Sequence, residues 1–307
     1  MIKPPPLRSG DRIALVSPAS PFSREAFKRG VAEIQRLGYE PVYDQSVFDR
    51  AMFTSGTETV RAEAFTRAWL DPRVAALMAV RGGYGSVQLL PALNSSRMCE
   101  APKLFIGYSD NTSLLSWLTC QCGITVLHGP MIEGGLARGP EGYDQRSLVQ
   151  LMGGGSEGFE LQPDGLTVVK AGTAQGQLFG GTLSLLAGSL GTPFAFDPPH
   201  GSILFLEDVD ERPYRIDRLM TQLRLSGVLA RASGLLFGEM RGCDEPSGTL
   251  TARDVIEALT ADFEGPVLIG FPSGHTSGPA WTLPLGVRVR METTPRPCLV
   301  VEESPVA

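Results

Sequence analysis

The sequence predicts an α/β protein, with a parallel-sheet, Rossmann-like (flavodoxin-like) N-terminal domain and a smaller, mixed α/β C-terminal domain. In the first half, short buried apolar runs alternate with segments whose apolar residues recur at helical spacing. This order is typical of a parallel sheet with helices on both faces. In the second half the strands are short and the helices few. The Gly-rich stretch 153–165 is interpreted as a linker, so domains are expected at 1–155 and 166–307.

The elements of the first half follow from apolar runs and stop signals. Gly38 ends the first helix as a C-cap, and Asp71-Pro72 stops the second. In such a sheet, functional loops lie at the carboxyl ends of the strands. The expected strands are 12–16, 41–43, 74–80, 104–107 and 124–127, and the expected helices are 23–37, 58–70 and 111–120.

The second half has six short apolar runs of strand character and two segments of helical character. No internal repeat is visible. The expected strands are 166–170, 202–206, 234–237, 267–269, 287–290 and 298–301, and the expected helices are 213–225 and 252–262.

Composition excludes several classes of protein. A chain of 307 residues with 42% hydrophobic and 20% charged residues can bury a large core. A net charge of −6 gives no basic footprint for nucleic acid or an anionic membrane. No apolar run is long enough to span a bilayer, and the Pro-rich start has no signal-peptide core, so a cytoplasmic location is expected. The five scattered cysteines match neither a disulfide framework nor a zinc site, and are interpreted as reduced thiols.

The strongest local motif is a strand, a tight turn with a serine, and a helix, in the order Leu104 to Asn111. A nucleophile elbow has this order, because the sharp turn exposes the hydroxyl beside a helix N-terminus. The backbone N–H of Asp110, which follows Ser109, would point at an oxyanion. The motif is only half of G-x-S-x-G, and a simple helix N-cap explains the serine equally well.

The preceding strand ends in the loop Arg81-Gly82-Gly83-Tyr84-Gly85. Its glycines allow a ligand to approach the backbone, and one N–H could be the second oxyanion donor. The spacing does not fit a dinucleotide fingerprint, and a plain tight turn is the alternative. Arg81, Gly82 and Tyr84 are the candidate substrate-binding residues, although Arg81 could equally form a structural ion pair.

A serine nucleophile needs a base, and the chain has three histidines. His275 lies in a Gly/Pro-rich loop after a strand, His128 also ends a strand, and His200 lies in a predicted exposed turn. Glu207 is the first polar residue after the strand 202–206, so it is the best candidate to orient the base. The acidic run from Glu207 to Glu211 also allows a metal site, although no metal-binding spacing supports one.

Six short motifs, in the same order over nearly the whole chain, resemble the LD-carboxypeptidase family of serine peptidases (peptidase family S66). The motifs are Gly82–Gly85, Ile106–Asp110, His128–Met131, Gly180–Ser184 with Gly191–Pro193, Leu206–Asp208 through Tyr214–Arg218, and the loop around His275. The resemblance implies a Ser–Glu–His triad of Ser109, Glu207 and His275, with an oxyanion hole at Asp110 and Gly83. It also implies a site between two domains, a homodimer, and no metal or cofactor.

Members of this family remove the terminal D-alanine from muropeptide tetrapeptides during cell-wall recycling, so a muropeptide is the expected substrate. A second branch resembles microcin-immunity enzymes, which cleave peptidyl or aminoacyl adenylates and stack the nucleobase on an aromatic side chain in an inserted loop. The region from Glu133 to Gln162 has no Trp and offers only Tyr143 and Phe159, which favours the muropeptide branch. A non-catalytic ligand-binding protein on the same scaffold is the alternative of another class.

Overall fold

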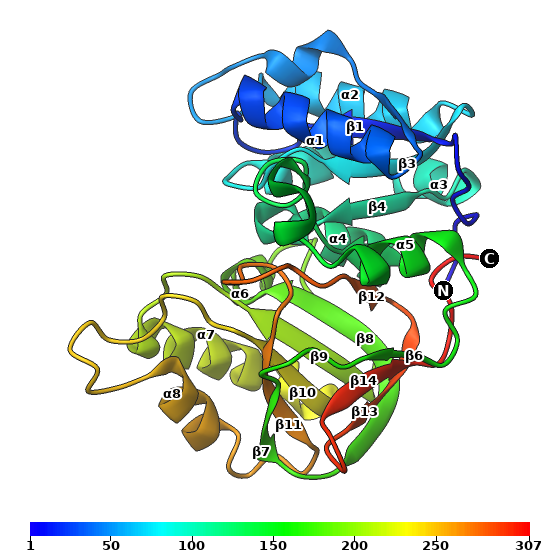
Figure 1. The fold of residues 1–307 in the computed structure, drawn as a ribbon. Helices are drawn as coiled ribbons and strands as arrows, with labels where there is room; N and C mark the ends of the chain where they lie inside the picture. Colours follow the sequence, from blue (N-terminus) through cyan, green and yellow to red (C-terminus); the bar gives the residue numbers. More distant parts are fainter.

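The computed structural model describes all residues from 1 to 307, arranged around two β-sheets that lie one above the other (Figure 1). The first sheet has six strands in the order β12-β5-β4-β3-β1-β2, and β1 to β5 are parallel. The order 2-1-3-4-5 is that of flavodoxin-like folds. The predicted α/β fold class is confirmed. The five strands are β1 (Arg12–Val16), β2 (Glu40–Val42), β3 (Val74–Ala79), β4 (Leu104–Gly107) and β5 (Val126–His128).

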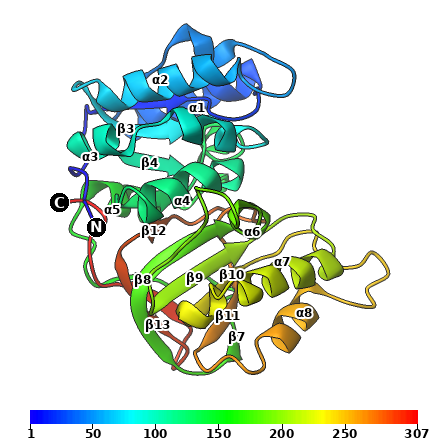
Figure 2. The same ribbon diagram turned by 180° about the vertical axis from the view of Figure 1, so that it is seen from behind.

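The helices of the first half cover both faces of this sheet, with α1 and α5 on one side and α2, α3 and α4 on the other (Figures 1 and 2). Side-chain caps begin most of them: Ser23 accepts from the N–H of Ala26, and Thr57 from that of Val60. The helices are α1 (Arg24–Arg36), α2 (Glu58–Leu70), α3 (Ser95–Glu100), α4 (Thr112–Cys120) and α5 (Gln145–Gly153). The sequence did not predict α3 or α5.

The second sheet is mixed and has eight strands, in the order β6-β14-β13-β8-β9-β10-β11-β7. Its centre, β8 to β11, is parallel, and the outer strands are antiparallel. The strands are β6 (Phe159–Leu161), β7 (Thr167–Lys170), β8 (Thr173–Thr182), β9 (Ser202–Glu207), β10 (Ala232–Gly238), β11 (Val267–Phe271), β13 (Arg288–Glu292) and β14 (Cys298–Val301).

Three helices pack beside the parallel centre of the second sheet and share an apolar cluster with β9, β10 and β11. They are α6 (Leu183–Ser189), α7 (Pro213–Leu225) and α8 (Ala252–Leu259). Figure 2 shows α7 and α8 on the face of this sheet that is turned to the viewer. Helix α8 ends at Leu259, so the expected helix 252–262 is three residues too long at its end.

The two sheets share chain segments. Strand β12 (Leu283–Leu285) lies in the sequence between β11 and β13 of the second sheet, but pairs antiparallel with β5 of the first. Strand β6 lies in the stretch 153–165 and pairs with β14. The division of the chain at this stretch stays a prediction, and residues 283–285 join the first sheet.

The two ends of the chain lie side by side (Figure 1), and the N–H of Ala307 donates to the carbonyl of Pro4 at 3.0 Å. All five cysteines are free thiols. None of the helices combines the length and the apolar character that a transmembrane segment requires.

Candidate active site

Ser109 lies at the carboxyl end of β4, on a turn that leads directly into α4. Its φ is +60°, in the left-handed region that a residue with a side chain seldom adopts. The turn is stabilised from behind: the side-chain amide of Asn111 donates to the carbonyls of Tyr108 and Arg81, each at 3.2 Å. Strand, strained turn and helix together project the hydroxyl away from the sheet, as a nucleophile elbow does.

The glycine loop after β3 lies against this turn. A side-chain carbon on Gly82 would lie 2.7 Å from Cβ of Ser109, 2.9 Å from its Oγ and 3.4 Å from the N of Asp110. The N–H of Gly83 has no acceptor within the protein. The carboxylate of Asp110 accepts from the N–H of Ser86 at 2.7 Å, which ties the loop to the turn. Only a residue without a side chain fits at position 82. Because Gly82 has none, the backbone of the glycine loop can lie next to the hydroxyl of Ser109.

Glu207 and His275 reach Ser109 from the second sheet. His275, in the loop after β11, has Nε2 3.1 Å from Oγ of Ser109 and Nδ1 2.8 Å from Oε2 of Glu207. The backbone N–H of His275 also donates to Oε2 at 3.1 Å. Glu207 is the last residue of β9 and is completely buried. The three side chains therefore form one hydrogen-bonded chain from carboxylate to imidazole to hydroxyl.

Thr182, at the end of β8, is a further partner that the sequence did not single out. Its hydroxyl donates to Oε1 of Glu207 at 2.5 Å, and its N–H donates to the hydroxyl of Thr112 on α4 at 3.1 Å. Both oxygens of the buried carboxylate thus have hydrogen-bond donors, as a buried charge requires. The signal in the sequence was the motif Gly180–Ser184, which is the end of β8 and the start of α6.

The charges of Glu207 and His275 influence each other's pKa. Burial alone would raise the pKa of Glu207, but the hydrogen bond and positive charge of His275 and the Thr182 hydroxyl keep it below its ordinary value. Burial alone would lower the pKa of His275, but the hydrogen bond and charge of Glu207 raise it above its ordinary value. The carboxylate therefore stays ionised and makes the imidazole a stronger base.

The other two histidines do not contact Ser109. His200 is exposed in a turn. His128 ends β5, is completely buried, and its Nδ1 lies 2.9 Å from Oγ of Ser273. Of the two rivals that the sequence left open, the structure thus brings His275 and not His128 to the serine.

The acidic run after β9 does not converge on a common point. The carboxylate of Asp208 accepts from the N–H groups of Ser184 and Val209, at 2.8 and 2.9 Å, and Glu211 lies 3.4 Å from Arg215. No three His, Cys, Asp or Glu side chains lie together in a way that could hold a metal ion. Asp208 therefore supports the start of α6.

Arg81 and Tyr84 have different surroundings. The guanidinium of Arg81 donates to the carbonyl of Pro21 at 2.5 Å and lies 3.2 Å from the carboxylate of Glu133. Glu133 in turn accepts from the N–H of Ser23, the N-cap of α1. These contacts favour the structural ion pair. Tyr84 is exposed, and its ring lies 6.1 Å from that of Phe53.

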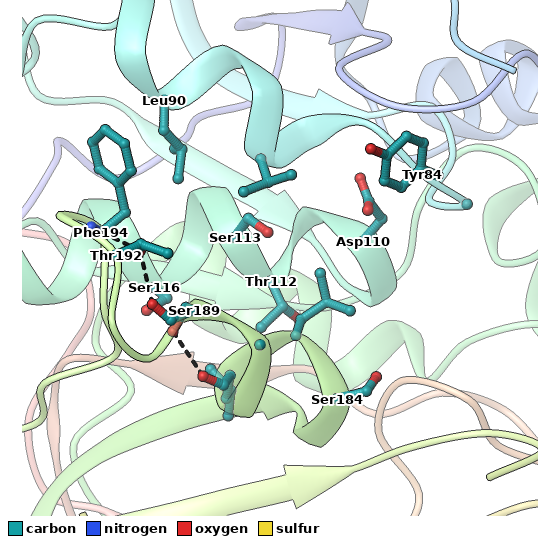
Figure 3. A pocket seen from close by; sticks show the side chains of 15 residues that line it. Tyr84, Leu90, Asp110, Thr112, Ser113, Ser116, Ser184, Ser189, Thr192 and Phe194 are labelled. Carbon is teal, nitrogen blue, oxygen red and sulfur yellow. Dashed lines mark hydrogen bonds between the residues drawn. The ribbon is translucent and has the colours of Figure 1, made fainter. Parts of the chain in front are cut away.

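A cavity of about 290 Å³ opens next to the turn, between α4 and α6. Gly83 is among its lining residues, with Tyr84 and Asp110 at one end of the cavity and Phe194 at the other (Figure 3). Its walls combine hydroxyl groups with apolar side chains, and Asp110 is the one charged residue among them. The lining side chains labelled in Figure 3 are Tyr84, Leu90, Asp110, Thr112, Ser113, Ser116, Ser184, Ser189, Thr192 and Phe194.

Comparison with known proteins agrees with the fold and identifies the family. The sequence matches the model of the LD-carboxypeptidase N-terminal domain over residues 13–129 and that of the LD-carboxypeptidase C-terminal domain over residues 175–291. The murein tetrapeptide carboxypeptidase of Pseudomonas aeruginosa is 32% identical over 274 residues, which cover 86% of this chain and 88% of the relative. The chain belongs to the LD-carboxypeptidase family.

Two solved structures represent the branches within this fold. The muramoyltetrapeptide carboxypeptidase of Oxalobacter formigenes superposes with a TM-score of 0.85 and 27% identity, over 96% of this chain and 100% of the other. The microcin C7 self-immunity protein MccF, in complex with aspartyl sulfamoyl adenosine, superposes with a TM-score of 0.91 and 26% identity over 100% of both chains. In sequence, MccF of Escherichia coli is 27% identical over 317 residues, 94% of this chain and 92% of that protein.

Proposed function

We propose that this protein is a serine LD-carboxypeptidase that removes the terminal D-alanine from muropeptide tetrapeptides. The observation that carries the proposal is the hydrogen-bonded chain of Ser109, His275 and Glu207, with distances of 3.1 and 2.8 Å. Membership of the LD-carboxypeptidase family, and the activity in the name of the Pseudomonas aeruginosa relative, supply the reaction and the substrate class.

In the first half of the reaction, Oγ of Ser109 attacks the carbonyl carbon of the scissile amide while Nε2 of His275 takes the hydroxyl proton. Glu207 holds the imidazole through Nδ1 and stabilises the imidazolium that forms. The oxyanion accepts hydrogen bonds from the N–H groups of Asp110 and Gly83, and each such donor contributes about 3–4 kcal/mol of transition-state stabilisation. The imidazolium then gives its proton to the amine, and free D-alanine leaves.

In the second half, water attacks the ester that joins the peptide to Ser109. His275 accepts a proton from this water and returns it to Oγ as the ester bond breaks, so that the serine is regenerated. The product is the shortened peptide with a new carboxylate. These steps need no cofactor, because all four proton transfers use the imidazole of His275.

A second candidate is the hydrolysis of a peptidyl or aminoacyl adenylate, because the fold matches that of MccF bound to aspartyl sulfamoyl adenosine. The two aromatic residues between Glu133 and Gln162 offer little for nucleobase stacking. The ring of Tyr143 is buried and its hydroxyl donates to Glu33 at 2.7 Å. Phe159 is in β6, with the guanidinium of Arg146 5.1 Å above its ring. The muropeptide substrate is therefore preferred.

We further propose, on the family resemblance, that the enzyme is a homodimer and acts in the cytoplasm on recycled peptides. Sedimentation equilibrium of the purified protein tests the first statement, and fractionation of the native cell tests the second. Arg81, Gly82 and Tyr84 stay proposed substrate-binding residues. Of these, Gly82 has the strongest support, because it lies beside the nucleophile: a side-chain carbon there would be 2.9 Å from Oγ of Ser109.

The test is D-alanine release from a purified muropeptide tetrapeptide by the wild type, by Ser109→Ala and by the control Ser96→Ala, an exposed serine on α3. We expect release by the wild type and the control, and a loss of about 10⁶-fold in kcat for Ser109→Ala. An aminoacyl adenylate is assayed in parallel. Hydrolysis of the adenylate alone would support the second candidate, and hydrolysis of neither by a folded protein would support a binding function.

A further inference from the structure

His128 has no role in the reaction described above, yet it is completely buried between the two sheets. Its Nδ1 lies 2.9 Å from Oγ of Ser273, and its Nε2 has no hydrogen-bond partner in the protein. A buried polar atom without a partner costs free energy, so a histidine here needs a compensating contribution. Ser273 is the one side chain with which the ring of His128 forms a hydrogen bond.

Ser273 is in the loop that carries His275. This loop leaves β11 at Phe271, and Ser273 is 1% exposed and two residues before His275. The loop is closed at its other end by the N–H of Trp281, which donates to the carbonyl of Pro272 at 2.7 Å. The chain then returns to His128 itself, because Leu283 of β12 is its partner in the first sheet. His128 therefore contacts both the start and the continuation of the loop.

Gly274, between Ser273 and His275, passes through a narrow gap. Its φ is +82°, and a side-chain carbon there would lie 2.7 Å from Cδ of Glu207 and 3.0 Å from Cε1 of His128. The loop is thus bounded on two sides, by Glu207 of the second sheet and by His128 of the first sheet.

We propose that His128 is a positioning residue, which holds the loop 272–276 through Ser273 so that His275 stays on Glu207 and Ser109. The ionisable groups that face it are Glu207 from β9, His275 from the loop after β11, and Tyr108 from the end of β4. Burial lowers the pKa of His128 to about 4. At neutral pH it is uncharged, and it does not compete with His275 for the carboxylate. The inference rests on the proposed role of His275 as the base.

The test is the pKa of His275, measured by NMR on protein labelled at the histidine ring nitrogens. Three histidines give a simple spectrum, and the exposed His200 is an internal reference. The variants are Ser273→Ala and His128→Leu, which remove the hydrogen bond, and His128→Asn, whose amide can replace Nδ1. Ser156→Ala is the control, because Ser156 is also completely buried but its hydroxyl has no partner.

We expect the pKa of His275 to fall in Ser273→Ala and His128→Leu, because the imidazole is held less firmly on Glu207. It should keep its wild-type value in His128→Asn and in the control. In turnover, kcat should fall about tenfold in the first two variants, with little change in KM, and a double variant should lose no more than either. His128→Asn should recover most of the activity.

An unchanged pKa of His275 and an unchanged kcat in folded Ser273→Ala would overturn the proposal. A His128→Asn variant as impaired as His128→Leu would overturn it too. If His128→Leu does not fold, Ser273→Ala decides, since it removes a single hydroxyl. The NMR measurement needs no turnover, so it separates a failure of this positioning role from a failure of the proposed reaction, which Ser109→Ala reports.

Discussion

The nucleophile and its base are built in two different ways. Ser109 belongs to one continuous segment, in which β4, the strained turn and α4 follow each other between Leu104 and Cys120. His275 is held instead by groups from separate elements: Glu207 from β9, Thr182 from β8 through that carboxylate, and His128 from β5 through Ser273. The first arrangement is local in the sequence, whereas the second exists only once both sheets are in place.

Substitutions on the base side and on the nucleophile side should therefore have different effects. Changes on the base side should act on the protonation of His275, because each partner there contacts the imidazole, its carboxylate or the loop that carries it. Changes on the nucleophile side should act on the space around Oγ and on the oxyanion donors, with the protonation of His275 preserved.

Among the groups that surround Ser109 and His275, Glu207 on the base side should give the largest effect when it is changed to Gln. The amide is neutral, so the imidazolium loses its counter-charge, and we expect kcat to fall about 10⁴-fold. The fold should be kept, since Thr182 can still donate to the amide oxygen. Turnover by this variant within tenfold of the wild type would show that Glu207 does not support the base. Thermal unfolding followed by circular dichroism is the control.

A smaller effect is expected from Gly82→Ala, on the nucleophile side. The added methyl group would lie 2.7 Å from Cβ of Ser109, so the loop must move away together with the Gly83 donor. Loss of one oxyanion donor should lower kcat about 10²-fold or more. Gly153→Ala is the matched control, because neither glycine has a positive φ and a side-chain carbon at Gly153 meets nothing within 4 Å. Equal activity of both variants would contradict the close approach.

The smallest effect is a shift in the pH profile. The base must be neutral, so kcat/KM should fall as the pH is lowered through the pKa of His275. Since Glu207 raises this pKa, the acid midpoint should lie above 6.5, the ordinary value for histidine. In Glu207→Gln burial dominates, and the midpoint should move to lower pH, whereas Gly82→Ala should leave it unchanged. A common midpoint in the wild type and Glu207→Gln would show that the pair is not coupled.

The same contrast explains which parts of the molecule the sequence could predict. The elbow around Ser109 was predictable because its strand, turn and helix are contiguous. Glu207 could be placed at the end of a buried strand, but the residues alone left His275 and His128 as rivals, and only the family resemblance separated them. Which histidine faces Ser109 depends on how the two sheets pack together, and a local sequence pattern does not predict this packing.

The sequence did not predict three strands, β6, β8 and β12, and for the last two there is a physical reason. Strand β8 contains Gly176, Gly180 and Gly181, which lower strand propensity; at Gly176 and Gly180, though, a side-chain carbon would run into the carbonyls of Gly201 and Phe205. The close approach of the neighbouring backbone thus requires glycine, and the same glycines make the strand hard to predict from the sequence. Strand β12 contains Pro284, which argues against a central strand, and β12 is indeed at the edge of its sheet.

We propose that Ser109 is a nucleophile activated by a base from the other sheet. The most direct measurement is labelling with a fluorophosphonate, followed by mass spectrometry of the digested protein, for the wild type, His275→Ala and His128→Asn. We expect one adduct, on Ser109, in the wild type and His128→Asn, and very slow labelling of His275→Ala. Labelling at another residue, or labelling of Ser109 at the wild-type rate without His275, would contradict this proposal.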